Sequence, residues 1–281
     1  MNPTQHGIRY FLAGGFHRMA FTAWGDADAP VVVCVHGLTR NGRDFDPLAA
    51  GLADRFRVIC PDLPGRGQSD WLPDPMLYQA QHYVIALGHL LAVLGREVAW
   101  VGTSLGGICG MVIAAAAGSP IGKLVLNDVG PALPAEALAR LRDTLPAPGL
   151  EPRFADLGAV ERHLRHAHAS FGSLTDARWA NLALHAARIL PDGGWILRHD
   201  PAIAAPLRAI APAAVDLWPL WGRIRVPVLA IRGETSDFLR PDVFARMRAD
   251  GARGLTVPGA GHAPALMDAV SIAAIRDFLL A

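Results

Sequence analysis

The sequence predicts an α/β fold, in which a mostly parallel, twisted sheet carries helices on both faces. Short apolar runs rich in β-branched residues, such as 31–35 and 226–232, are typical of strands that are covered on both sides. Segments with helical spacing of apolar residues alternate with these runs; the clearest is 78–94, which stops at Gly95. With 281 residues and 52% hydrophobic content, the chain can bury a large core.

The elements follow one another in an order that suits such a sheet. Residues 9–13 and 18–24 flank Gly14 and Gly15 and predict an antiparallel hairpin at a sheet edge. The other predicted strands are 31–35, 56–60, 98–101, 121–126, 226–232 and 255–257. Further helices are expected at 108–117, 241–248 and 265–280.

The alternation of strand and helix lapses between Pro131 and Pro212. Three helical patches, 134–145, 155–170 and 175–189, are separated there by breaks that contain Pro and Gly. We therefore predict a core formed by 1–131 and 213–281, with an inserted helical lid at 132–212. The lid contains His163, His166 and His168, but no Cys or carboxylate completes a familiar ligand pattern, so we expect neither a metal nor a cofactor.

The segment Gly102-Thr103-Ser104-Leu105-Gly106 joins a predicted strand to a predicted helix. A strained turn of this kind needs neighbours without Cβ atoms, and the two glycines stand two residues either side of Ser104. Such a turn exposes the serine hydroxyl and aims the first amides of the helix at an oxygen that becomes negative during attack. Ser104 is therefore a candidate nucleophile.

Three polar side chains, Ser104, Asp237 and His262, each fall just past the end of a predicted parallel strand, where an open α/β sheet has its ligand crevice. A serine hydroxyl is a weak nucleophile and needs an imidazole to take its proton. That imidazole in turn needs a carboxylate to fix its tautomer and stabilise its charged form. The order Ser, Asp, His is the one expected when the elbow precedes the other two loops.

These landmarks make the chain resemble the serine hydrolases of the α/β-hydrolase fold. The matching landmarks are His36-Gly37, the loop 62–70, the elbow, the loop 233–237 and Gly261-His262. The resemblance implies that Ser104 is the nucleophile, His262 the base and Asp237 the acid, and that the amides of Leu38 and Leu105 form the oxyanion hole.

The identity of the acid has an alternative. Some members of this fold carry the acid one strand earlier, where this chain has Asp128. We favour Asp237 because the Gly-x-x-Ser-Asp loop resembles the usual acid position. Asp128 is then expected to be a structural residue at the hinge of the lid.

The resemblance implies hydrolysis of a small carboxylic ester, lactone or thioester. One alternative is a C–C bond hydrolase of ring-fission diketo acids, but those enzymes often have Asn before the nucleophile and Trp after the histidine, where this chain has Thr103 and Ala263. Another alternative is a ligand receptor without turnover. Dehalogenases and epoxide hydrolases are disfavoured because they use Asp at the elbow. The candidate substrate contacts are Arg40, Asn41, Phe171 and Trp179.

Charge and composition limit the partners. There are 26 basic and 25 acidic residues and no basic run, so we expect no nucleic acid or membrane partner. The three cysteines lie in or beside apolar segments, which suits reduced thiols. The first ten residues lack a signal-type apolar region, and no run approaches the roughly 20 apolar residues that span a bilayer. We expect a cytoplasmic protein that acts on a small molecule.

Overall fold

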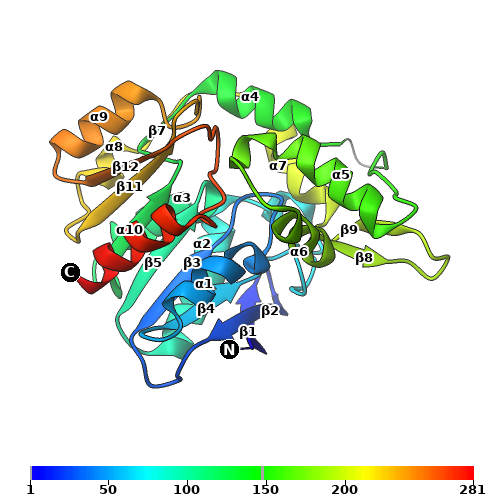
Figure 1. Ribbon diagram of the computed structural model, residues 1–281, viewed down its shortest axis with the longest axis horizontal. Helices are drawn as coiled ribbons and strands as arrows, with labels where there is room; N and C mark the ends of the chain where they lie inside the picture. The colour runs from blue at the N-terminus through cyan, green and yellow to red at the C-terminus, as the bar shows by residue number, and fades with distance from the viewer. Residues whose placement is uncertain (1, 147–148) are drawn as a thin grey trace.

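The computed structural model describes residues 2–146 and 149–281 and contains an eight-stranded sheet (Figure 1). From one edge to the other its strands are β1 (Thr4–Leu12), β2 (Gly15–Trp24), β4 (Arg57–Pro61), β3 (Val31–Val35), β5 (Val98–Thr103), β6 (Ile121–Asn127), β11 (Val228–Gly233) and β12 (Arg253–Val257). The pairs β1–β2 and β2–β4 are antiparallel and the others are parallel. The predicted fold class and the edge hairpin are confirmed.

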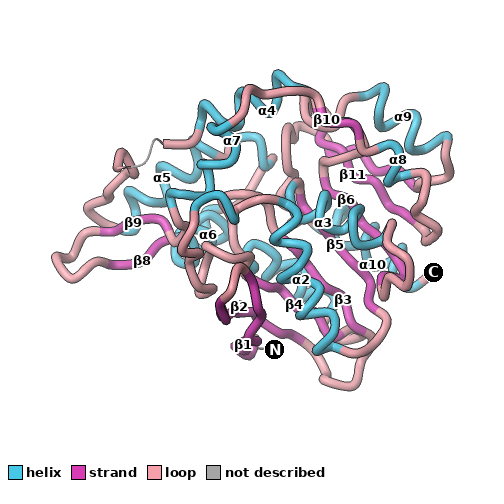
Figure 2. The backbone as a smooth tube through the Cα atoms, turned by 180° about the vertical axis from the view of Figure 1, so that it is seen from behind, coloured by secondary structure: helices cyan, strands magenta, loops and turns pink. Residues whose placement is uncertain are grey.

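Helices cover both faces of the sheet (Figures 1 and 2). One face is covered by α1 (Asp46–Leu52) and α10 (Ala269–Leu280), and the other by α2 (Ala80–Leu94), α3 (Leu105–Ala114), α8 (Trp218–Trp221) and α9 (Pro241–Ala249). Along β3, Val33 packs in one of the two resulting cores and Val32 in the other. Because both faces of the strand are buried, its apolar run is continuous.

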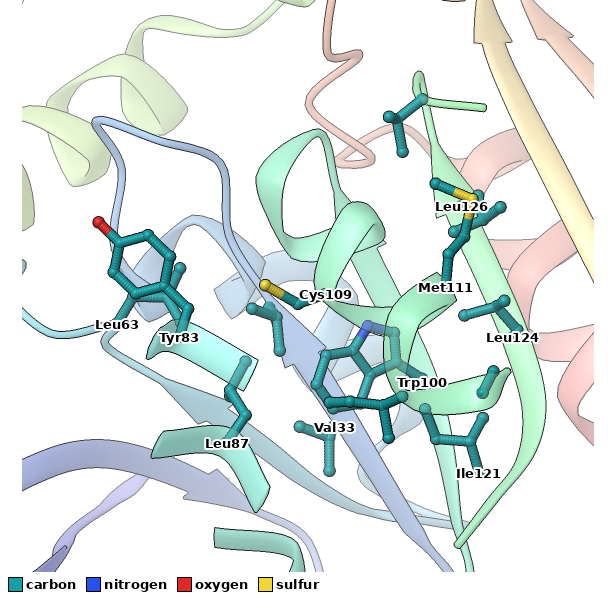
Figure 3. Close-up of a cluster of buried hydrophobic side chains, with 14 of the residues drawn as sticks. Val33, Leu63, Tyr83, Leu87, Trp100, Cys109, Met111, Ile121, Leu124 and Leu126 are labelled. Atoms are coloured by element: carbon teal, nitrogen blue, oxygen red, sulfur yellow. The ribbon is translucent and has the colours of Figure 1, made fainter. Parts of the chain in front are cut away.

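The core beneath the turn after β5 is built around Trp100 (Figure 3). This side chain is fully buried, and its indole N–H donates to the carbonyl of Gly106 at 3.0 Å. Leu124 and Met111, also fully buried, lie in the same cluster. The polar end of the indole is thus satisfied by the first turn of α3, so the packed core holds this turn directly.

The 132–212 segment contains α4 (Ala135–Thr144), α5 (Leu157–Ala167), α6 (Asp176–Ala186) and α7 (Ala205–Ala209). The first three correspond to the predicted helical patches. The prediction of helix as far as 189 was wrong, because the chain becomes extended after Ala186 and forms the hairpin β8 (Ala187–Ile189) and β9 (Trp195–Leu197). Short 3₁₀ helices are η1 (Gly42–Phe45), η2 (Pro75–Leu77), η3 (Ala169–Phe171) and η4 (Pro201–Ala204).

The start of the 132–212 segment pairs with residues just beyond its end in a small antiparallel sheet. Its strands are β7 (Ala132–Leu133) and β10 (Val215–Asp216), paired in the register Leu133 to Val215. Between these two strands the segment has its own apolar cluster, with Val160, Leu164 and Leu182 at its centre. In Figure 1 the helices of the segment lie beyond one end of the large sheet's strands. The division into a core and a lid stays a prediction.

The last helix begins later than predicted. Leu266 has a positive φ of 56°, and α10 starts at Ala269, where the side chain of Asp268 accepts from the amide of Ser271 at 2.8 Å. Within residues 2–146 and 149–281, none of the helices combines the length and the apolar character that spanning a bilayer requires.

Candidate active site

The turn between β5 and α3 has the strained geometry that the sequence predicts. Ser104 has φ 50° and ψ −112°, a positive φ that non-glycine residues rarely adopt. A Cβ atom at Gly102 would overlap the backbone of Gly106, and one at Gly106 would overlap the carbonyl of Val35. Only glycine fits at these two positions, so they fix where the serine hydroxyl lies.

His262 connects two side chains that come from different strands. Its Nε2 lies 3.0 Å from Oγ of Ser104, and its Nδ1 lies 2.8 Å from Oδ2 of Asp128. Asp128 follows β6, and His262 lies on the loop after β12. These contacts have the geometry of a nucleophile, a base and an orienting acid.

The expectation that Asp237 orients His262 was wrong. Asp237 forms an ion pair with Arg140 of α4, and its side chain is 51% exposed, whereas that of Asp128 is fully buried. The loop before Asp237 instead provides Ser236, whose hydroxyl donates to Oδ2 of Asp128 at 2.6 Å. The carboxylate one strand earlier therefore occupies the position of the acid.

Several donors hold the Asp128 carboxylate. Oδ1 accepts from the amide of Gly233 at 2.8 Å, and Oδ2 accepts from the amide of Ala263 at 3.2 Å in addition to Ser236 and His262. A buried charge is tolerated only when hydrogen bonds replace its hydration. These bonds also fix the direction in which the carboxylate meets the imidazole.

The amides of Leu38 and Leu105 are the predicted oxyanion donors. Leu38 lines the pocket beside Ser104, and Leu105 is the first residue of α3. Within the described residues neither amide donates to a protein acceptor. Both donors are thus left for a ligand oxygen.

Hydrogen bonds from buried side chains fix the loop that carries Leu38. The carbonyl of Leu38 accepts from Nε of the fully buried Arg66 at 2.8 Å. Nε2 of His36 accepts from the amide of Leu63 at 2.9 Å, which leaves Nδ1 to donate to the carbonyl of Gly37 at 2.7 Å. Burial lowers the pKa of His36 to about 3, so it stays neutral and has a structural role.

The loop that carries His262 is tied both to the elbow and to the 132–212 segment. Nδ2 of Asn127 donates to Oγ1 of Thr103 at 3.0 Å and to the carbonyl of Pro264 at 2.8 Å. From η3, the hydroxyl of Ser170 donates to the carbonyl of His262 at 2.9 Å, and its own carbonyl accepts from the amide of Gly261 at 2.8 Å. The placement of the imidazole therefore depends on both parts of the chain.

A pocket of about 1020 Å³ opens onto Ser104. It is lined from the sheet side by residues such as Leu38, Ser104 and Phe238, and from the 132–212 segment by residues that include Leu141, Leu145, Leu164 and Phe171. Much of the wall is apolar. A small organic ester of several carbon atoms fits such a cavity.

Two of the four candidate substrate contacts line this pocket and two do not. Arg40 and Phe171 belong to the wall. Asn41 is instead buried within the fold, where its Nδ2 donates to the carbonyl of His185, and Trp179 packs inside the apolar cluster of the 132–212 segment. Asn41 and Trp179 therefore join elements of the fold to one another.

Burial favours the neutral form of three histidines in the pocket wall. Burial lowers the pKa of His199 to about 4 and places the pKa of His168 well below its usual value. Burial also lowers the pKa of His163. The charge of Arg40 adds to the effect on His168 and His199.

Sequence reasoning missed His199 and Ser236. His199 follows the β8–β9 hairpin, which the sequence did not predict, so nothing in its spacing placed it near the pocket. Ser236 directly precedes Asp237, the residue expected from the sequence to be the acid. The role of Ser236 follows from the hydrogen bond that its hydroxyl donates to Asp128, which the sequence alone does not predict. Across the described ranges no group of three or more His, Cys, Asp or Glu is arranged to hold a metal ion.

Comparison with known proteins places these features in a family context. The model of the alpha/beta hydrolase family matches residues 32–274. A 3-hydroxybutyrate-oligomer hydrolase of Cupriavidus necator is 42% identical over 99% of this chain and 98% of that protein. An esterase of Mycobacterium tuberculosis is 31% identical over 85% of this chain and 78% of its own length. The crystal structure of an alpha/beta hydrolase from Novosphingobium aromaticivorans, 37% identical, superimposes with a TM-score of 0.88 over 99% of this chain and 98% of that one.

Proposed function

The chain belongs to the alpha/beta hydrolase family, and on that premise we propose that this hydrolase cleaves carboxylic esters through an acyl-enzyme on Ser104. The observation that carries the proposal is the pair of contacts made by His262, 3.0 Å from the serine oxygen and 2.8 Å from the Asp128 carboxylate. A neutral imidazole in that position can accept the serine proton at Nε2 while Nδ1–H stays bonded to Asp128.

Acylation then follows from the positions of the side chains. Oγ of Ser104 attacks the ester carbonyl carbon and its proton passes to Nε2 of His262, while the carbonyl oxygen becomes an oxyanion. The amides of Leu38 and Leu105 donate to that oxyanion. When the tetrahedral species collapses, the bond to the alcohol oxygen breaks and the alcohol leaves with the proton from His262.

Deacylation repeats these steps with water. His262 takes a proton from a water molecule that attacks the acyl carbon, and the same two amides stabilise the second oxyanion. Collapse returns the proton to Oγ of Ser104 and releases the acid. Asp128 keeps its negative charge and stabilises the imidazolium in both halves of the cycle.

The substrate we propose is an oligoester of a short hydroxy acid, with 3-hydroxybutyrate oligomers as the leading case. Support comes from the relative of that activity, which aligns with nearly the whole chain, and from the size and apolar wall of the pocket. Small lactones and thioesters present the same carbonyl chemistry.

The C–C hydrolase alternative has no specific support in the site. Thr103 stands before the nucleophile, and its hydroxyl accepts from Asn127 inside the fold. Ala263 stands after the histidine, and its methyl side chain offers neither an aromatic face nor a hydrogen bond to a diketo acid. The contacts of the serine, imidazole and carboxylate set support turnover and do not favour the receptor alternative, in which that set persists without turnover.

A labelling and turnover experiment tests the proposal. A fluorophosphonate should label Ser104 stoichiometrically, and the wild-type protein should hydrolyse the 3-hydroxybutyrate dimer and short p-nitrophenyl esters with kcat above about 1 s⁻¹, the low end for ordinary enzymes. Ser104→Ala should lose labelling and turnover and keep its melting temperature. Labelling at another serine, or cleavage of a diketo acid faster than every ester tested, would overturn the proposal.

A further inference from the structure

The wall of the pocket between Arg40 and β9 has more hydrogen-bond donors than acceptors. A guanidinium carries five N–H groups. In Arg40, Nε and Nη2 donate to Asp44 at 2.7 and 2.8 Å, and Nη1 donates to Nε2 of His168 at 3.4 Å. The two remaining N–H groups have no acceptor among the residues that the structure describes.

The contact with Arg40 also determines the tautomer of His168. Since Nε2 accepts from the guanidinium, the ring carries its proton on Nδ1, and that N–H has no protein acceptor in the described part of the chain. His163 and His199 line the same pocket, and each neutral ring adds one N–H that no described protein group accepts. Such a set of donors calls for a ligand that supplies acceptor oxygens.

The guanidinium is held rigidly in this position. The side chain of Arg40 is 7% exposed, its plane is fixed by two bonds to Asp44, and it lies 5.9 Å from the centre of the Phe171 ring. Phe171 in turn stacks on His168, with 4.6 Å between the ring centres. A prearranged donor set of this kind binds a planar acceptor without paying for side-chain ordering.

The donors lie near the reacting centre. Arg40 follows Leu38 by two positions, and Phe171 belongs to η3, which is hydrogen-bonded to the loop of His262. Besides Asp44, the pocket wall has two carboxylates, Asp143 and Asp237. They are paired with Arg142 and Arg140, respectively, and lie on the α4 side.

We propose that Arg40, His168 and His199, with His163 beside them, form a subsite for the terminal carboxylate of the substrate, so that the enzyme prefers esters that end in a free acid. This rests on the proposed ester hydrolysis at Ser104. The oligoester reaches the serine with its acid end anchored at the subsite, and the ester bond next to that end lies at the nucleophile. The preferred substrate is therefore a short, acid-terminated oligoester.

A pair of substrates isolates the carboxylate. The 3-hydroxybutyrate dimer and its terminal amide share the same ester bond and differ in the charge of one end. The wild-type enzyme should have a kcat/KM for the acid at least about tenfold above that for the amide, mainly through KM, because charge-assisted hydrogen bonds to the carboxylate are lost in the amide. The ratio of the two values within each variant cancels any general loss of activity.

Matched variants identify the donors. Arg40→Gln with Asp44→Asn removes both charges of the buried pair together, and should bring the ratio close to one. His168→Leu and His199→Leu should each lower it severalfold, and these two decide the question if the double variant does not fold. The control is Arg140→Gln with Asp237→Asn, the same exchange at the exposed ion pair of the pocket rim, which should keep the wild-type ratio.

The possible outcomes distinguish a failure of the proposed carboxylate subsite from a failure of the proposed ester hydrolysis. If the wild-type enzyme hydrolyses p-nitrophenyl acetate but treats acid and amide alike, the subsite is wrong and ester hydrolysis stands. If the ratio collapses in the Arg140 control and not in the Arg40 variant, the carboxylate binds at the rim and the proposal is wrong. If no ester is hydrolysed at all, the proposed function itself is wrong.

Discussion

Oδ2 of Asp128 lies 2.8 Å from Nδ1 of His262, although 134 positions separate the two residues in the chain. The contact is possible because β6 and β11 are neighbours in the sheet and the loop after β12 returns across their ends. It places a fully buried carboxylate behind the imidazole that contacts Ser104.

The first prediction compares the two aspartates. Asp128→Asn should lower kcat by about 10³ to 10⁴, because an amide in this position favours the wrong imidazole tautomer and does not stabilise the imidazolium. Asp237→Asn, at the exposed ion pair with Arg140, should change kcat by less than about threefold, the scale of an exposed pair. Steady-state kinetics of both variants with one ester decides between them. A larger loss in Asp237→Asn would return the acid role to that residue.

The second prediction concerns Ser236, whose hydroxyl donates to Asp128 and accepts from the amides of Phe238 and Leu239. Ser236→Ala should lower the free energy of unfolding by about 1–3 kcal/mol, because it leaves buried polar groups without partners. It should also lower kcat about tenfold, through a less well-held carboxylate. Urea unfolding and kinetics measure the two effects. The matched control is Ser119→Ala, which removes a hydroxyl that accepts from the amide of Ile121 and should leave kcat unchanged. Equal kcat in the two variants would contradict the assigned role.

The third prediction concerns the glycines of the elbow. Gly106→Ala should destabilise the protein by more than about 3 kcal/mol or prevent folding, because its Cβ would overlap the carbonyl of Val35. Gly88 offers the opposite case, since it lies within α2 with open space where a Cβ would be. Gly88→Ala should stabilise the protein by about 0.5–1 kcal/mol. Thermal unfolding of the two variants should therefore move in opposite directions, and a stable Gly106→Ala protein would mean that the elbow is looser than described.

The fourth prediction is a loss of stability in mild acid. Burial lowers the pKa of His36 to about 3 and that of His199 to about 4, from an ordinary 6.5. Below pH 6.5 the unfolded chain binds protons at these rings and the folded chain does not, so the free energy of unfolding falls by about 1.4 kcal/mol per pH unit for each ring. Burial also raises the pKa of Asp62 to about 6. Below pH 6 the folded chain therefore binds about one proton more than the unfolded chain at this carboxyl, which offsets the effect of one of the rings on the free energy of unfolding. The neutral ring of His168 adds to the fall.

Urea unfolding between pH 7 and 5 measures this effect. The free energy of unfolding should be level above pH 6.5 and decrease towards pH 5. His36→Gln, which cannot take up a proton when unfolded, should have a lower stability at pH 7 and a shallower decrease. A stability that is independent of pH in this range would show that the buried rings titrate alike in both states.

The sequence was sufficient for the sheet and for two of the three residues that meet at its edge. A strand such as β3 is apolar at every position because both faces are covered, and the elbow glycines have no substitute, so both features are local and can be read from the chain. The choice between Asp128 and Asp237 is different. Both follow parallel strands, and the deciding fact is that Ser236 and the amide of Gly233 turn towards Asp128.

The 132–212 segment was the least predictable part, for a related reason. Its helices were expected, but whether Asn41 and Trp179 face the cavity or the interior depends on how those helices pack on one another. The hairpin of β8 and β9 is stabilised by pairing between the two strands, and each strand is too short for an alternating apolar pattern to predict it. His199, which that hairpin carries to the pocket, could therefore not be assigned in advance.

The pairing of β7 with β10 has a consequence for how such a chain can diverge over evolution. On the predicted division into a core and a lid, the residues between these two short strands can change in length and sequence without altering the spacing of the strands whose following loops carry Ser104, Asp128 and His262. Selection for a new substrate can then act on that segment while the reaction is inherited intact. Each replacement segment also has to reproduce hydrogen bonds to the rest of the protein, such as those between Ser170 and the loop of His262 and between Asn41 and His185.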